Sequence, residues 1–364
     1  MLNVEIQAPS NRNGGAALHA INRPIPLKIR LSSQDYDWKQ EVERELTTRL
    51  HGSPGPLMRA SILYRSNRAH VILTFHHSIA DALSGVFIIR DLMAALNGYV
   101  VLPLPMTRSA EAMLAALPVA APQEDKQAVP HLDPEELRAI AARDIWRDFS
   151  GDRVTVSTMA LSEVLTERLR EHARANGTTV NGAICAALAL HVFERDGAET
   201  CTLGNAINVR TTLGVEEECG FFATVSFVDL PRGRRDAFWA LARQATEDLV
   251  APRTLAGVSA SLDFMAAYIT AETPQEIANG IFGSGKSDAF LSNMGKLSIP
   301  QTVGCLHLDA FWGPMSQAHR KQECFIGVAT LGNRLRLVQT SPDDVPSMLN
   351  AIREHLSEAV NSRD

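Results

Sequence analysis

The stretch Phe75-His76-His77-Ser78-Ile79-Ala80-Asp81-Ala82 places two adjacent histidines and an aspartate between two regular patterns. Upstream, apolar-rich runs at 57–63 and 69–75 flank Ser66-Asn67-Arg68, which predicts a β-hairpin. Downstream, the apolar residues from 83 to 96 follow a helical spacing. The stretch is therefore expected to be a loop that leaves a strand and enters a helix.

The paired histidines are the residues of this loop that are best suited to catalysis. Imidazole has an ordinary pKa near neutrality, which suits proton abstraction from a hydroxyl, an amine or a thiol. A histidine just past a strand end is also well placed to face a cleft. From residue types alone three interpretations stay open: structural histidines bonded to backbone, a general base, or a metal site with His70.

Length and composition indicate a two-domain globular protein. A chain of 364 residues exceeds what one hydrophobic core usually fills, and 45% hydrophobic with 21% charged residues is ordinary for a folded protein. The net charge of −6 and the scattered basic residues argue against nucleic acid as a partner. No apolar run is long enough to span a bilayer and no signal peptide is recognised, so we expect a cytoplasmic protein without a membrane span.

Six prolines between residues 103 and 134 indicate an inter-domain linker. The expected division is an N-terminal domain at 1–103, a linker at 104–150 and a C-terminal domain at 151–364. Strand and helix patterns in the second half alternate irregularly, which predicts an α+β fold with mixed sheets. The predicted strands are 154–161, 202–209, 224–230, 289–292, 324–331 and 334–340, and the predicted helices are 163–175, 180–194 and 345–360.

The loop resembles the HHxxxDG motif of nonribosomal peptide condensation domains and related acyltransferases, which include phthiocerol dimycocerosyl transferases, alcohol acetyltransferases, plant BAHD acyltransferases and chloramphenicol acetyltransferase. The resemblance continues along most of the chain in the expected order. It is carried by the segments Gly55–Ala60, Leu83-Ser84-Gly85, Gly177–Ala183, Asn208-Val209-Arg210 and Leu291-Ser292-Asn293-Met294-Gly295.

This resemblance implies two chloramphenicol-acetyltransferase-like domains, each a mixed β-sheet with flanking helices, with a channel between them. It implies that His77 is the general base, that His76 supports the loop and that Asp81 forms a structural salt bridge with Arg210. The implied donor is an acyl-CoA or phosphopantetheinyl thioester, with no permanently bound cofactor and no metal. The implied acceptor is an alcohol or amine, and an acyl carrier protein is a candidate partner.

Two departures from the family pattern bear on this expectation. Ala82 stands where the motif has glycine, which adds a methyl group at the turn. The chain also begins at Met1-Leu2-Asn3-Val4, later than the usual start, so we expect an abbreviated N-terminal domain.

Further candidates lie in the second half. Ser292 or Asn293 could donate to the oxyanion of acyl transfer, although the same stretch also fits a strand end and turn with Gly295 at positive φ. Trp312, in Asp309–Pro314, is a candidate packed aromatic or substrate contact. Gly283-Ser284-Gly285-Lys286-Ser287 lacks the spacing of a phosphate-binding loop and is expected to be a flexible loop.

Two other functions compete with acyl transfer. A non-catalytic, condensation-like scaffold would account for Ala82 and the late start, although an intact His77 argues against it. A metal-dependent hydrolase using His76, His77 and Asp81 would need further ligands at helical or hairpin spacing, and the sequence offers none. Five widely spaced cysteines have no C-x-x-C pair, and most of them are expected to be small buried hydrophobes.

Overall fold

The structure, a computed structural model, describes residues 4–7, 17–31, 37–50, 55–103, 107–117, 131–149, 151–233, 238–270 and 272–362. The chain forms two compact units. Unit 1 comprises residues 1–154, 213–222 and 259–285, and unit 2 comprises residues 155–212, 223–258 and 286–364. Residues 104–106, 118–130 and 150 of the predicted linker lie outside the described residues. Its described parts contain the short helices α3 (Ala110–Leu114) and α4 (Pro134–Ala141).

Unit 1 is built on a three-stranded sheet in the order β3 (Leu27–Leu31), β4 (Met58–Arg65) and β5 (Arg68–Phe75). Strands β4 and β5 form an antiparallel hairpin around Ser66, whose φ of 49° is typical of a tight hairpin turn. The predicted hairpin is therefore confirmed. Strand β3 pairs with β4 in parallel and was not predicted, and a separate pair joins β1 (Val4–Gln7) to β2 (Ala17–Ala20).

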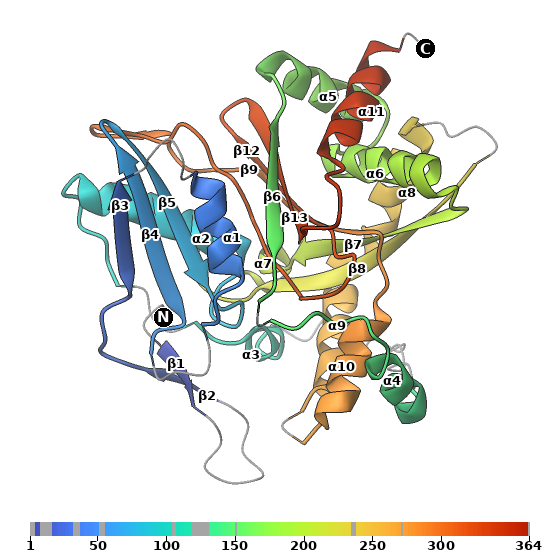
Figure 1. The fold of residues 1–364 in the computed structure, drawn as a ribbon, viewed down its shortest axis with the longest axis horizontal. Helices are drawn as coiled ribbons and strands as arrows, with labels where there is room; N and C mark the ends of the chain where they lie inside the picture. Colours follow the sequence, from blue (N-terminus) through green and yellow to red (C-terminus); the bar gives the residue numbers. More distant parts are fainter. Residues whose placement is uncertain are drawn as a thin grey trace. The chain divides into compact units, whose positions relative to one another are not determined.

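Helix α1 (Trp38–Leu46) lies on one face of this sheet (Figure 1). Its buried Glu41 accepts hydrogen bonds from Lys28 of β3 and Ser61 of β4, each at 3.0 Å. An ion pair between Arg59 and Glu45 adds a second polar contact between helix and sheet. Because each buried carboxylate has a cationic partner, the face of α1 that carries Glu41 and Glu45 can be buried against the sheet.

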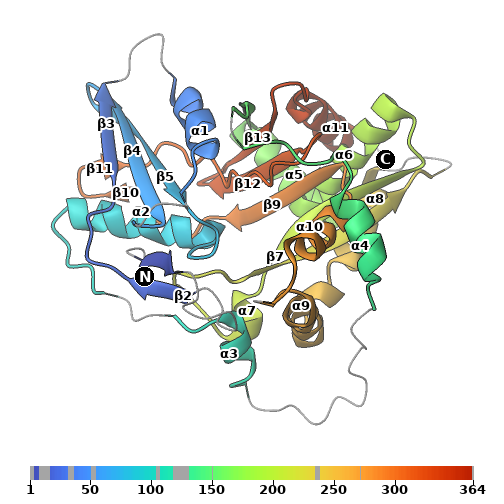
Figure 2. The same cartoon turned by 60° about the horizontal axis from the view of Figure 1, so that its bottom comes forward.

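Helix α2 (Ala82–Leu96) follows the histidine loop, as predicted. Asp81 is its N-cap, and Gly98 takes a φ of +79° just beyond its end. Figure 2 shows α1 and α2 on opposite faces of the three-stranded sheet. The loop therefore connects the β4–β5 hairpin to a helix on the same sheet.

Helix α10 (Gln275–Ser284) packs closely on α4. A Cβ atom at Gly280 would lie 2.2 Å from the carbonyl oxygen of Leu137, so only glycine permits this approach. The preceding helix is α9 (Leu255–Tyr268). The expectation of a flexible loop at 283–287 was wrong for Gly283 and Ser284, because these residues end α10.

Unit 2 contains a six-stranded mixed sheet in the order β6-β13-β12-β9-β7-β8. Antiparallel pairs at β12–β13 and β7–β8 are joined by parallel pairs of β9 with β12 and with β7. The strands are β6 (Val154–Ala160), β7 (Thr200–Asn208), β8 (Ala223–Pro231), β9 (Ala289–Lys296), β12 (Phe325–Leu331) and β13 (Arg334–Pro342). A two-stranded hairpin joins β10 (Thr302–Val303) to β11 (Leu306–His307). These mixed sheets confirm the predicted α+β class.

Helix α6 (Val180–Asp196) is the buried centre of the helical layer and packs against α8 (Phe238–Asp248) and α11 (Leu349–Asn361) (Figure 1). Thr179 caps it by accepting the Gly182 N–H at 3.0 Å, as predicted. The helices α5 (Glu163–Ala175) and α7 (Arg210–Leu213) and the 3₁₀ turn η1 (Ala251–Arg253) complete the unit.

The cysteines are free thiols. Cys185, Cys201 and Cys324 are buried, as expected, and burial raises the pKa of the Cys185 and Cys324 thiols to about 12. Cys219 is half-buried and Cys305 is exposed.

Candidate active site

The loop between β5 and α2 is fixed by its two buried residues. Ile79 and Ala80 are fully buried and belong to an apolar cluster with Leu57. The backbone N–H of His76 donates to the Leu57 carbonyl at 2.8 Å, and the Ile79 N–H donates to the His76 carbonyl at 3.1 Å. The loop is therefore a tight turn with an apolar anchor, and its ends are held while His77 and Ser78 are exposed.

The tautomer of His77 follows from its hydrogen bond to the backbone. Its Nδ1 lies 3.0 Å from the carbonyl oxygen of Ala80. A carbonyl can only accept, so Nδ1 carries the hydrogen, and in the neutral ring Nε2 then has the free lone pair. An exposed imidazole with a deprotonated Nε2 is the form that a general base requires.

A phenylalanine covers one side of this imidazole. The rings of His77 and Phe221 are nearly perpendicular, at 88°, with their centroids 4.9 Å apart. This is the edge-to-face geometry that aromatic pairs prefer. Phe221 was not a predicted site residue, because it lies so far from His77 along the chain that no sequence spacing could have indicated the contact.

His76 is directed into the loop itself. Its Nδ1 accepts the Ser78 backbone N–H at 3.3 Å and lies 2.8 Å from the Ser78 hydroxyl. Because Nδ1 accepts, this ring carries its hydrogen on Nε2, opposite to the tautomer of His77.

Asp81 is almost fully buried, at 4% exposure, and both carboxylate oxygens accept hydrogen bonds. Oδ1 accepts the Ser84 N–H at 2.9 Å, which caps α2, and also lies 2.9 Å from the Ser84 hydroxyl. Oδ2 accepts the Phe222 N–H at 3.1 Å. Asp81 therefore ties the histidine loop to a segment that is distant in the sequence.

Residues 217–222, the clasp segment, belong to unit 1 although residues 155–212 and 223–258 belong to unit 2. Gly220 is held at both backbone groups: its N–H donates to the Ser84 hydroxyl at 3.0 Å, and its carbonyl accepts the Asp81 N–H at 3.0 Å. Glu217 forms an ion pair with Arg90 of α2. These contacts hold the clasp segment against α2, from its N-cap Asp81 to Arg90 in its middle.

Ala82 occupies the first turn of α2 without strain. The only described non-glycine residues with positive φ are Ser66, His319 and Gln322, so the backbone at Ala82 is one that any L-residue can adopt. The methyl group that replaces the motif glycine is accommodated.

Arg210 begins α7 in unit 2 and is 4% exposed. Its backbone N–H donates to the Asn208 side chain at 3.1 Å. Asp81 and Arg210 belong to different units, and their salt bridge stays a prediction.

Ser292 and Asn293 lie in β9, opposite Gly327 and Val328 of β12. Asn293 Oδ1 accepts the Gly295 N–H at 2.8 Å, and Gly295 has a φ of +68°. The predicted positive φ at Gly295 is thus confirmed, but Gly295 lies within β9, at a register shift in the pairing with β12, and not in a turn after the strand end. The Asn293 side-chain NH₂ is not used in the bond to Gly295, because only its oxygen accepts there.

Trp312 stacks beneath the guanidinium of Arg336, which lies 5.6 Å from the ring centroid. Arg336 also donates to the Asp309 carbonyl at 3.1 Å, and burial lowers the pKa of its guanidinium. The half-buried tryptophan therefore contacts an arginine of unit 2, and a substrate contact at this residue stays a prediction.

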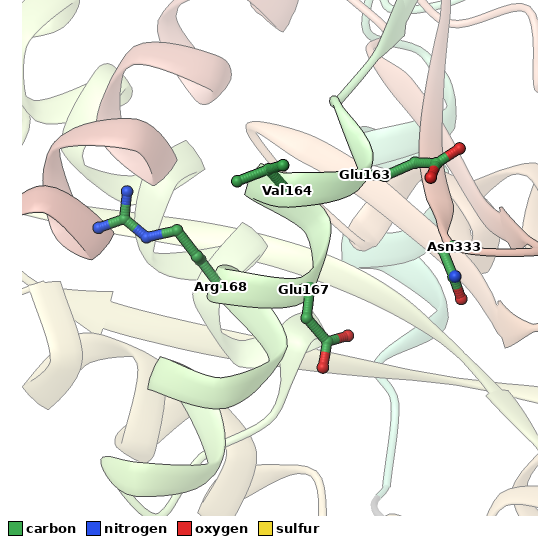
Figure 3. Close-up of a pocket in the computed structure, with 5 residues that line it drawn as sticks. All are labelled: Glu163, Val164, Glu167, Arg168 and Asn333. Carbon is green, nitrogen blue, oxygen red and sulfur yellow. The ribbon is translucent and has the colours of Figure 1, made fainter.

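A small pocket lies at the start of α5 and involves none of the predicted site residues (Figure 3). It is lined by Glu163, Val164, Glu167, Arg168 and Asn333. In the described part of the chain, no three His, Cys, Asp or Glu side chains come together as a metal-binding group. A search of the same residues found no helix with the length and apolarity needed to cross a membrane.

Comparison with known proteins identifies the family. Residues 150–337, more than half of the chain, match the family described as phthiocerol/phthiodiolone dimycocerosyl transferase C-terminus. One of the plipastatin synthase proteins of Bacillus subtilis is 26% identical over 232 residues, which are 60% of this chain. The matched region amounts to only 9% of that synthase protein.

Solved structures agree with the observed fold. The first condensation domain of the CDA synthetase is similar with a TM-score of 0.65 and 16% identity, over 99% of this chain and 84% of that chain. Polyketide synthase associated protein 5 from Mycobacterium tuberculosis is similar with a TM-score of 0.60 and 16% identity, over 99% of this chain and 87% of that chain. These likenesses support the two-domain α+β architecture. The chain therefore belongs to the phthiocerol/phthiodiolone dimycocerosyl transferase C-terminus family, and it shares its fold with condensation domains.

Proposed function

We propose that the protein is an acyltransferase that moves an acyl group from a CoA or carrier-protein thioester to an alcohol or amine, with His77 as general base. The observation that carries this proposal is the hydrogen bond from His77 Nδ1 to the Ala80 carbonyl, which leaves Nε2 as an exposed proton acceptor. Family membership supplies the reaction class.

The proposed reaction balances with imidazole alone. Nε2 removes the proton of the acceptor hydroxyl or amine as its oxygen or nitrogen attacks the thioester carbonyl. The tetrahedral oxyanion then collapses, the carbon–sulfur bond breaks, and the imidazolium returns its proton to the leaving thiolate. The products are an ester or amide and a free thiol, and His77 ends in its starting form.

His76 is not proposed as the base, because its Nδ1 already accepts from Ser78 and its turn-side position supports the loop. Asp81 is proposed to stabilise the loop and not to relay a proton, because its oxygens accept from Ser84 and Phe222.

Mass spectrometry of the purified protein with a panel of acyl thioesters and acceptors tests the reaction. Acyl-CoAs and acyl carrier proteins loaded with the same acyl groups are offered separately, each with an alcohol or an amine. Formation of an ester or amide together with free thiol supports the proposal and identifies the donor. Failure of every donor and acceptor to react, while His77→Ala and wild type bind a carrier protein equally, would favour the non-catalytic scaffold instead.

A side-chain donor to the oxyanion is expected at Ser292 or Asn293. Losing such a donor typically lowers kcat by about 10²- to 10³-fold. Asn293→Asp keeps the oxygen that accepts from Gly295 but removes the NH₂ donor, and Ser292→Ala removes a hydroxyl. We expect one of the two variants to lose kcat on this scale in the thiol-release assay. Wild-type turnover in both would exclude these side chains as oxyanion donors.

Removal of metal ions is expected to leave activity unchanged, because the proposed chemistry uses imidazole and hydrogen bonds only. Dialysis against a strong chelator, followed by the same assay and a thermal melt, measures this. Parallel loss of bound zinc and activity, restored by added zinc, would instead favour the hydrolase built on His76, His77 and Asp81.

A further inference from the structure

We propose that Phe221 is a positioning residue that sets the tilt of the His77 imidazole, so that Nε2 is held in the direction of the acceptor. This inference rests on the proposed function, because it assigns Phe221 a role through the general base. It is not a role in binding substrate.

One hydrogen bond does not fix an exposed ring. The bond from Nδ1 to the Ala80 carbonyl sets one direction in the imidazole plane, but the ring can still tip about that bond. His77 is exposed, so the surrounding core does not limit this motion. Contact with the perpendicular ring of Phe221 supplies the second constraint.

Phe221 can do this because its own backbone is held on both sides. Gly220 bonds to Ser84 and Asp81, and the Phe222 N–H donates to Asp81. Phe222 is a buried anchor, at 1% exposure, whereas Phe221 is 46% exposed. Phe222 therefore anchors the segment in the core, and the ring of the more exposed Phe221 contacts His77.

Asp81 therefore supports both partners of the contact between His77 and Phe221. It caps the helix that follows the His77 loop, and it binds the backbone of the clasp segment that carries Phe221. The position of the aspartate four residues after the base is explained by this double attachment.

Kinetics of three variants test the inference in the full chain. Phe221→Leu keeps an apolar side chain but removes the ring, and we expect kcat to fall by about 3- to 10-fold with little change in KM. Phe221→Tyr should have a kcat close to that of wild type, because the aromatic contact with His77 is kept. Phe282→Leu is the matched control, since Phe282 is exposed to a similar extent, at 55%, on α10, and should behave as wild type.

A rise in KM with unchanged kcat in Phe221→Leu would overturn the positioning role. A kcat of Phe221→Tyr as low as that of Phe221→Leu would overturn it as well. Phe221→Leu should also cause no further loss in the His77→Ala background, because the group it positions is absent there. An undiminished loss in that background would equally contradict the inference.

A second measurement separates this inference from the proposed function. In protein labelled with ¹⁵N-histidine, with the His77 signals assigned by their loss in His77→Gln, we expect the Nδ1-protonated tautomer. Phe221→Leu should shift the His77 ring signals, and Phe282→Leu should not. Unchanged His77 signals in Phe221→Leu would overturn the positioning role alone, whatever the activity. Wild-type turnover by His77→Ala would instead overturn the proposed function on which the positioning role rests.

Discussion

Replacing His77 by alanine is expected to lower kcat by about 10²- to 10⁴-fold, the usual contribution of a general base. The side chain is exposed, and its Nδ1 bonds to a backbone carbonyl that can bond to water instead. The fold should therefore persist, and KM should change little because binding does not depend on proton abstraction. Product formation in the thioester assay, with circular dichroism as a check of folding, measures the effect.

His76→Ala is the matched control for this prediction. It removes the adjacent imidazole, whose Nδ1 accepts from Ser78 and holds the turn. We expect a smaller loss of kcat than for His77→Ala and a larger loss of stability. If His77→Ala turned over at the wild-type rate, or if His76→Ala were the more damaging to kcat, the assignment of the base would be wrong.

The local elements around the site could be predicted from the sequence because their signals are local. The hairpin β4–β5 follows from two apolar runs around a short polar turn, and α2 follows from helical spacing ended by Asn97-Gly98. Thr179 as a helix cap is likewise a short-range signal. In each case the partners lie within a few residues.

Other parts could not be predicted because their cause is tertiary. Gly283-Ser284 resembles a loop by local preference, yet these residues end α10, whose Gly280 approaches the backbone of Leu137 in α4. Packing of two helices overrides the weak helix preference of glycine there. Similarly, nothing near Asp81 in the sequence indicates that its carboxylate receives the Phe222 N–H.

The second large effect is expected at Asp81 and Arg210, the predicted structural ion pair. Both side chains are 4% exposed, and a buried charge is costly without a partner. Removing one member of a buried pair typically costs about 3–5 kcal/mol, because the other charge is left uncompensated. Asp81→Ala also leaves the N–H groups of Ser84 and Phe222 without their acceptor. We therefore expect each single alanine variant to lower the free energy of unfolding on this scale, and Asp81→Ala the more of the two.

A double-mutant cycle distinguishes the ion pair from the hydrogen bonds of Asp81 within unit 1. If the two side chains pair, Arg210→Ala should cost clearly less in the Asp81→Ala background than in wild type, because the charge it served is already gone. Asp81→Asn adds a control, since the amide oxygen can still accept the Ser84 N–H while the negative charge is lost. Denaturant unfolding of the four proteins in the cycle gives the coupling energy. Strict additivity would show that Asp81 acts only as helix cap and acceptor for the clasp segment. The role of Asp81 would then be to hold the His77 loop and Phe221 within one unit, with Arg210 stabilising unit 2 independently.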